Sequence, residues 1–134
     1  MVADFWSVIG SNAVTSRPDV EVAIGKIERR LQVIDLADLA SYQDQLYQNL
    51  NALDLSCLAS VQVESAGGLV LEQTADHFLY ARCACLLAGR DKVREVLANQ
   101  ESFSEFVAPR FQSAEALLYL ARTEYQRRTG RPMR

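Results

Sequence analysis

The chain has 134 residues, a length that fits one domain, and 49% of them are hydrophobic, as in an ordinary soluble globular protein. No apolar run approaches the roughly 18 residues that span a bilayer, so we expect no membrane association. The net charge of −3 hides an asymmetry, because residues 122–134 carry a net charge of +4 and residues 1–121 one of −7. Such an acidic body disfavours nucleic acid as a partner.

The cysteines and the N-terminus indicate the compartment. Cys57, Cys83 and Cys85 are odd in number, and the last two point about 200° apart if they share a helix. This pattern predicts neither a disulfide framework nor a metal site, where ligands must converge. The N-terminus also lacks the basic and apolar segments of a secretion signal. We therefore expect a cytoplasmic protein without a metal or another cofactor.

The first half of the chain is predicted to be helical. Asp4 is placed to cap a short first helix, and Ser16 followed by Pro18 is typical of the start of a second. Apolar residues of the second helix recur at steps of four and three, namely Val20, Ile24, Ile27, Leu31 and Ile34. A third helix is predicted to begin at Asp35 and to keep one polar face.

The region that follows has a different pattern. Val61 and Val63 alternate with polar residues, and Gly67 and Gly68 are typical of a turn. This pattern predicts a short hairpin near residues 61–72.

The second half returns to helices. Thr74 is placed to cap a helix that ends at Gly89, where glycine permits a left-handed backbone. A helix over residues 91–99 follows. Ser102 and Glu105 then have the spacing of a capping box, which predicts a short helical turn.

A last helix is predicted from about residue 110 to residue 128, with Gly130 ending it. The elements together predict an all-α, compact bundle of about six or seven helices. We expect one helical domain over residues 1–130 and a basic C-terminal tail over residues 131–134. The surface pattern permits either a monomer or a homodimer.

Arg82 is the first candidate for a functional residue, because it interrupts an apolar helix. A buried arginine is costly unless a carboxylate meets it, so we expect a structural ion pair. The candidate partners are Asp54, Asp76, Glu115 and Glu124. The alternative is an anion-binding arginine at a cleft, in a ligand site formed by Arg82, Asp76, His77 and Tyr80.

Two further sets of residues deserve a hypothesis. His77, the only histidine, is adjacent to Asp76, but neighbouring residues on a helix point about 100° apart, so we assign no catalytic residue. Phe5 and Trp6 are predicted to anchor the first helix in the core. They would instead bind a partner if that helix were loosely docked. Arg127 and Arg128, in the basic C-terminal stretch, are further candidates for partner binding.

The motif Asp-x-Phe-x-Tyr-x-Arg, formed by Asp76, Phe78, Tyr80 and Arg82, precedes Gly89-Arg90. With an opening Phe5-Trp6-x-x-Ile9 and a last helix that carries Tyr119 and Tyr125 and closes on Thr129-Gly130, it resembles the bacterial family called domain of unknown function 4240. The chain departs from that pattern, since it has Asp76 alone where an acidic pair is expected. The resemblance implies a helix over residues 55–63, which we favour over the hairpin, and it implies no activity.

Three functions follow, in descending order of preference. The first is a non-catalytic protein-interaction or regulatory module, which would neutralise a basic partner with its acidic body. The second is a small-molecule or anion-binding module centred on Arg82. The third is an acid–base enzyme that uses His77 and Asp76.

Overall fold

The computed structural model describes residues 4–64 and 70–133. These residues are largely helical, which confirms the predicted all-α bundle. The α-helices are α1 (Phe5–Ile9), α2 (Arg17–Leu31), α3 (Leu36–Ala52), α4 (Ser56–Ala59), α5 (Ala75–Ala88), α6 (Arg90–Ala98) and α7 (Leu120–Thr129). Two 3-10 helices, η1 (Gln100–Phe106) and η2 (Pro109–Leu118), lie between α6 and α7 in the chain.

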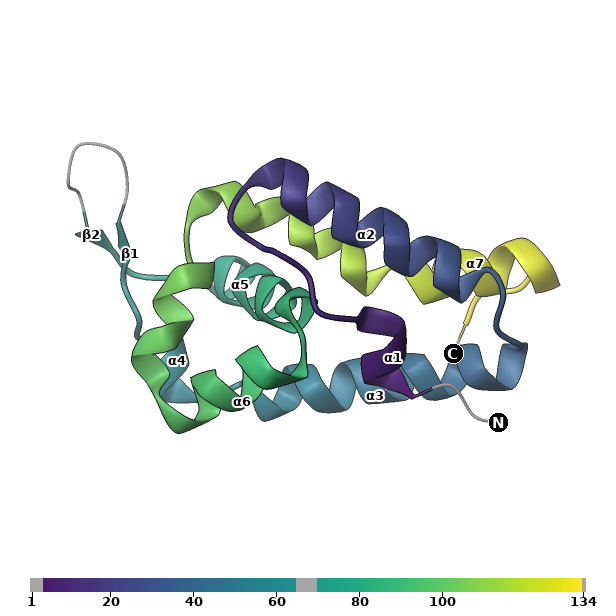
Figure 1. Ribbon diagram of the computed structural model, residues 1–134, viewed down its shortest axis with the longest axis horizontal. Coiled ribbons are helices and arrows are strands. Elements are labelled where there is room, and N and C mark those ends of the chain that lie inside the picture. Colours follow the sequence, from purple (N-terminus) through teal and green to yellow (C-terminus); the bar gives the residue numbers. More distant parts are fainter. Residues whose placement is uncertain (1–3, 65–69, 134) are drawn as a thin grey trace.

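Helix α5 is the centre of the bundle. It contacts α2, α3, α6, η1 and η2, and Figure 1 shows it between α2 on one side and α3 on the other. Its buried residues surround the helix axis and do not form a single stripe, as Phe78, Ala81, Cys83, Ala84, Cys85, Leu86 and Leu87 show. The hairpin lies at one end of the molecule, and both termini lie toward the other.

Three predicted helix starts are confirmed by their side-chain caps. The Ser16 hydroxyl accepts a hydrogen bond from the Asp19 amide, and the Asp35 carboxylate accepts one from the Asp38 amide. The Thr74 hydroxyl accepts one from the His77 amide, in the first turn of α5, at 3.1 Å. Each cap satisfies an N–H group that has no partner within its own helix. Local sequence was therefore sufficient to place these three starts.

The hairpin exists, although each strand has only two residues. Strand β1 (Val63–Glu64) pairs antiparallel with β2 (Val70–Leu71), with Val63 opposite Leu71. The favoured helix over residues 55–63 is therefore wrong in its second half, since α4 ends at Ala59. The β-branched residues that alternate with polar ones take the extended conformation that suits them. The predicted turn at Gly67 and Gly68 lies outside the described residues.

The long last helix is also corrected, because η2 is a 3-10 helix and α7 begins only at Leu120. Three buried residues of η2, Phe111, Ala114 and Leu117, recur at steps of three. A 3-10 helix has three residues per turn, so this spacing puts all three on one face, which η2 packs against α5. At the start of η1, Asn99 is the cap, and the predicted capping box at Ser102 is wrong.

Side chains from other elements satisfy several helix C-termini. Arg30 of α2 donates from Nη1 to the Val8 carbonyl at 2.8 Å, where α1 ends. Asn12 donates from Nδ2 to the Leu87 carbonyl at 2.7 Å, near the end of α5. The last carbonyls of a helix lack partners within the helix and carry a partial negative charge, so cationic and amide donors suit them. Some of the predicted site residues have this same role, as donors to the carbonyls at helix ends.

Candidate functional site

Arg82 meets a helix end and not a carboxylate. Its Nη1 donates to the Leu50 carbonyl near the end of α3 at 3.0 Å, and its Cζ lies 4.4 Å from the centre of the Phe78 ring. Among the described residues no acidic side chain pairs with Arg82, so the predicted ion pair is wrong. A carbonyl and an aromatic face replace the carboxylate. The Nε atom of Arg82 is buried without a hydrogen-bond partner within the same residues.

His77 holds a loop in place. Its Nε2 lies 2.5 Å from the Val107 carbonyl, and because a carbonyl only accepts, this nitrogen is the donor. His77 and Tyr80 line a cavity of only about 10 Å³, which is near the volume that one water needs. Asp76 is exposed, and no hydrogen bond joins it to His77 among the described contacts. On α5, Arg82 is about 200° away from Tyr80, so these predicted ligand residues do not face one mouth.

The surroundings of Tyr80 raise the pKa of its phenol. Partial desolvation, followed by the negative charge of Glu115, raises the pKa of the Tyr80 phenol. The Tyr119 hydroxyl donates to Oε1 of Glu115 at 3.1 Å on the surface of η2. The ordinary pKa of a tyrosine phenol is about 10, so both phenols are protonated near neutral pH even without these upward shifts.

Phe5 and Trp6 fill the core, as predicted for anchors of the first helix. Phe5 is fully buried, with its ring centre 4.9 Å from that of Trp6 and 5.2 Å from that of Tyr42. Trp6 is half-buried and packs against the same core. The ring of Phe5 is therefore not available to a partner in this conformation.

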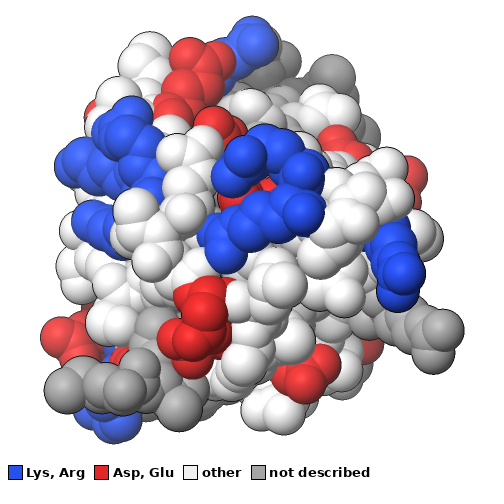
Figure 2. All heavy atoms as spheres, turned by 90° about the vertical axis from the view of Figure 1, so that its right-hand side faces the viewer, with Lys and Arg blue, Asp and Glu red and all other residues white. Residues whose placement is uncertain are grey.

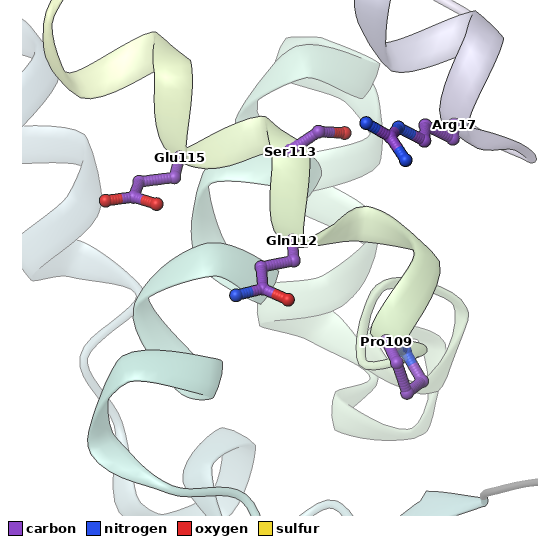
Figure 3. Close-up of a pocket in the computed structure, with 5 residues that line it drawn as sticks. All are labelled: Arg17, Pro109, Gln112, Ser113 and Glu115. Carbon is purple, nitrogen blue, oxygen red and sulfur yellow. The ribbon is translucent and has the colours of Figure 1, made fainter.

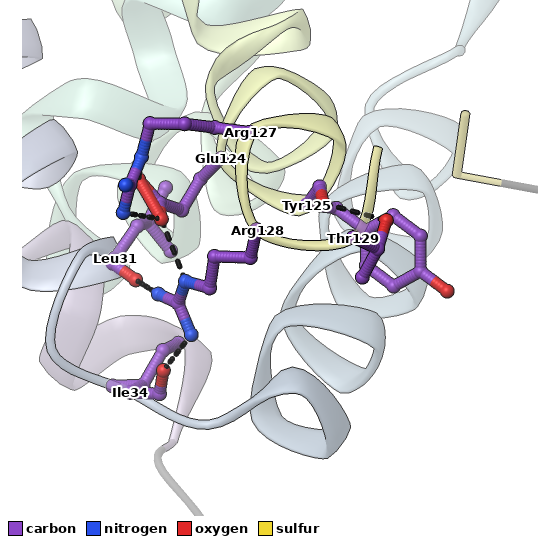
Figure 4. Close-up of polar contacts among 7 residues, drawn as sticks. All are labelled: Leu31, Ile34, Glu124, Tyr125, Arg127, Arg128 and Thr129. Carbon is purple, nitrogen blue, oxygen red and sulfur yellow. Dashed lines mark hydrogen bonds and ion pairs between the residues drawn. The ribbon is translucent and has the colours of Figure 1, made fainter. Parts of the chain in front are cut away.

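The buried ion pair lies on α7, between Glu124 and Arg128. Nε of Arg128 donates to Oε2 of Glu124 at 2.6 Å, and its two terminal nitrogens donate to the carbonyls of Leu31 and Ile34 (Figure 4). Arg127 adds two hydrogen bonds to the same carboxylate from a far more exposed position. These bonds from Arg127, with smaller contributions from Arg128, lower the pKa of Glu124 against the opposing effect of burial.

The sequence carried a signal for this pair. Glu124 precedes Arg127 and Arg128 by three and four residues, which places all three side chains on one side of a helix. Glu124 also continues the buried spacing of Leu117 and Ala121. Arg127 and Arg128 were expected only as candidates for partner binding, whereas Arg128 here joins α7 to the carbonyls of Leu31 and Ile34.

A groove of about 590 Å³ lies between α4 and η1, at the hairpin end of the bundle. Its lining residues are Cys57, Ser60, Val61, Gln100, Glu101 and Ser104. We call it the α4–η1 groove. Gln73, which follows β2, fixes the α4 side by donating from Nε2 to the carbonyls of Leu58, Ala59 and Val61.

A second pocket, of about 330 Å³, lies between the start of α2 and η2 (Figure 3). Figure 3 shows the Ser113 hydroxyl directed toward Arg17 and the Glu115 side chain directed to the other side. Arg17 is already paired with Glu21 at 3.2 Å, and both side chains are exposed. The positive charge in this pocket is therefore offset, and the pocket offers little to hold an anion.

The cysteines divide into one exposed and two buried thiols. Burial raises the pKa of both Cys83 and Cys85 to about 12, so neither is a nucleophile near neutral pH. Over residues 4–64 and 70–133, no three His, Cys, Asp or Glu side chains are grouped so as to hold a metal ion. In the same ranges, no helix has the length and apolarity of a membrane span.

The fold and these contacts define a small helical domain whose interior charges hold helix ends together. The chain belongs to the family described as "Protein of unknown function (DUF4240)", whose model matches residues 1–127. This match confirms the resemblance drawn from the sequence. No curated protein and no solved structure matches the chain.

Proposed function

We propose that the protein is a non-catalytic interaction module that binds a basic partner in the α4–η1 groove. The groove itself is the observation that carries this proposal, because it joins a hollow of about 590 Å³ to acidic and apolar side chains. A basic amphipathic helix is the kind of segment that fits such a groove, with apolar anchors inward and cations at the rim.

The charges around the groove favour a cationic partner. Glu101 lines the groove, Asp54 precedes α4, and Glu72 precedes Gln73, whose side chain is bonded to the α4 segment. All three acidic residues are exposed. Complementary charges at the rim of an interface increase the association rate and the specificity for a partner more than they increase the affinity.

The apolar residues around the groove supply surface for the affinity. Leu55, at the start of α4, is 40% exposed, and Leu97, one turn before η1, is 49% exposed. Large apolar side chains at the surface are ordinary singly, but here two belong to chain segments that adjoin the groove, which is itself lined in part by Val61. A partner that covers them removes apolar area from water.

The residues predicted to perform chemistry support a non-catalytic role. His77 donates to Val107, Arg82 donates to Leu50, and the thiols of Cys83 and Cys85 are buried. These groups stabilise the bundle. The free cysteines also suit a reducing compartment, so we propose a cytoplasmic location.

The test is a pull-down from cells of the source organism with three forms of the full chain. We expect the wild type to retain a basic protein at low salt and to release it at high salt, where charges are screened. Glu101→Lys should lose that protein. Glu28→Lys, which reverses an exposed acidic residue on α2, should keep it. Retention of nothing at low salt, or equal retention by both variants, would contradict the proposal.

A second candidate is anion binding at Arg82, favoured by the buried Nε that lacks a partner among the described residues. A thermal-shift screen with inorganic phosphate and nucleotides tests it. A ligand present at about 100 times its dissociation constant adds about 2.7 kcal/mol of stability. An unchanged melting temperature across both sets would remove this candidate.

A further inference from the structure

The end of the bundle opposite the hairpin carries a separate hollow of about 560 Å³. It is lined by Ala40 of α3, Tyr125 of α7, and the segment after α7, namely Arg131, Pro132 and Met133. We call it the C-terminal hollow. Figure 2 looks onto this end of the molecule and shows several separate patches of Lys and Arg side chains among uncharged and acidic ones.

A defined turn builds this hollow. Gly130 takes the left-handed conformation, with φ of +70°, and ends α7. The Thr129 hydroxyl accepts a hydrogen bond from the Arg131 amide at 3.1 Å and lies 2.9 Å from the Tyr125 carbonyl. The turn sends the chain back onto the body, where Met133 packs against the core. The wall formed by residues 131–133 is therefore held in place without a ligand.

The charge of the hollow comes from a single lining residue. Arg128 is bonded to Glu124 and two carbonyls, and Arg127 is bonded to Glu124. Arg131 is exposed, and no acidic side chain pairs with it in the part of the chain that the structure describes. Its guanidinium is the cationic group that a ligand in the hollow would meet.

We propose that the C-terminal hollow binds a small organic acid, a monocarboxylate with an apolar body. Arg131 presents the planar fork of donors that matches a carboxylate. The Tyr125 ring, Pro132 and Met133 contact the apolar body. The volume lies within the roughly 300–1,000 Å³ of small-molecule sites, which are mostly apolar with a few polar groups that orient the ligand.

The charge of the ligand is the first readout. Octanoate, octylamine and octanol share one apolar chain, so we titrate the full-length protein with each and follow binding by ligand-observed NMR. Octanoate should bind most tightly and octylamine most weakly. Affinity should rise from butanoate to octanoate by up to about fourfold for each added methylene, the equivalent of about 0.8 kcal/mol. Equal binding of octylamine and octanoate, or no binding of any acid, would overturn the proposal.

The matched variants are Arg131→Gln and Arg29→Gln, which each neutralise one exposed arginine. Arg131→Gln should weaken octanoate binding at least about tenfold, as expected for loss of a charged hydrogen bond. It should leave octanol binding unchanged, and Arg29→Gln, on α2 outside the hollow, should leave both unchanged. An equal loss in the two variants would mean that octanoate senses only net charge, which contradicts the proposal. Glu101→Lys should not alter octanoate binding, so this test is independent of the α4–η1 groove.

Discussion

Arg128 donates from Nε to Oε2 of Glu124 across 2.6 Å, and the Glu124 side chain is only 7% exposed. The same guanidinium donates to the carbonyls of Leu31 and Ile34, where α2 ends and the chain turns toward α3. One side chain of the last helix thus satisfies the end of the second helix. Arg128 is the hydrogen-bond partner of a buried carboxylate and of two carbonyls. Loss of its side chain should therefore lower the free energy of unfolding substantially.

Arg128→Ala should destabilise the protein by about 3 kcal/mol or more, because it leaves a buried carboxylate with one of its two arginines. Arg127→Ala is the matched control. Its side chain is 63% exposed against 21% for Arg128, so its loss should cost less than about 1 kcal/mol. Urea denaturation of both variants measures the difference. Equal costs would show that the carbonyl contacts add nothing.

The Glu124 carboxylate should make stability depend on pH. Its pKa in the folded protein lies below the ordinary 4.5, chiefly because Arg127 donates hydrogen bonds to it. A lowered pKa stabilises the folded state above the ordinary value, and this contribution is lost as the pH falls through the folded pKa. Glu124→Gln should therefore be less stable than the wild type at pH 7, and the gap should close in acid. A gap that is constant across the pH range would contradict the ionised pair.

Arg82→Met should cost about 1.5–3 kcal/mol, because the Leu50 carbonyl loses a charged donor. Asp54→Asn, which alters one of the carboxylates once expected to pair with Arg82, should change stability by less than about 0.5 kcal/mol. Thermal unfolding of both variants checks these values. A large loss of stability in Asp54→Asn would indicate an ion pair between Asp54 and Arg82, contrary to the contacts described above.

Gly89 joins α5 to α6 with φ of +109°, and a Cβ atom there would lie 2.8 Å from the Ser11 hydroxyl oxygen. Gly89→Ala should therefore destabilise the protein by more than the 1–2 kcal/mol or so that an unfavourable φ costs. Gly130→Ala is the control, since its φ is also positive but a Cβ would meet nothing within 4 Å. Denaturation should show a clearly larger loss of unfolding free energy for Gly89→Ala than for Gly130→Ala. The reverse order would show that the contact with Ser11 is not tight.

The helix starts could be predicted from the sequence, whereas the hydrogen-bond partners of side chains far apart in the chain could not. The caps at Ser16, Asp35 and Thr74 depend on residues three positions away, so short-range pattern was enough. The partner of Arg82 is a carbonyl 32 residues earlier in the chain. Every residue has a carbonyl, so no side-chain pattern marks which one an arginine will meet.

The site was predicted less well than the fold for the same reason. The motif around Asp76 and Tyr80 drew attention to one helix, whereas the α4–η1 groove is formed by segments about 40 residues apart in sequence. The step of three in Phe111, Ala114 and Leu117 was present in the sequence and marks the 3-10 helix that replaced the expected α-helix.

Cys57 offers the most direct measurement of the central claim, that the α4–η1 groove receives a basic segment. Its thiol is exposed and lines the groove, whereas Cys83 and Cys85 are buried. Alkylation followed by mass spectrometry should therefore modify Cys57 first in the native protein. A short amphipathic helical peptide of Lys and Leu should slow that reaction in a saturable, salt-sensitive manner, and a matched peptide of Glu and Leu should not. An alkylation rate of Cys57 that is unchanged at saturating Lys–Leu peptide, or slowed equally by both peptides, would contradict the account.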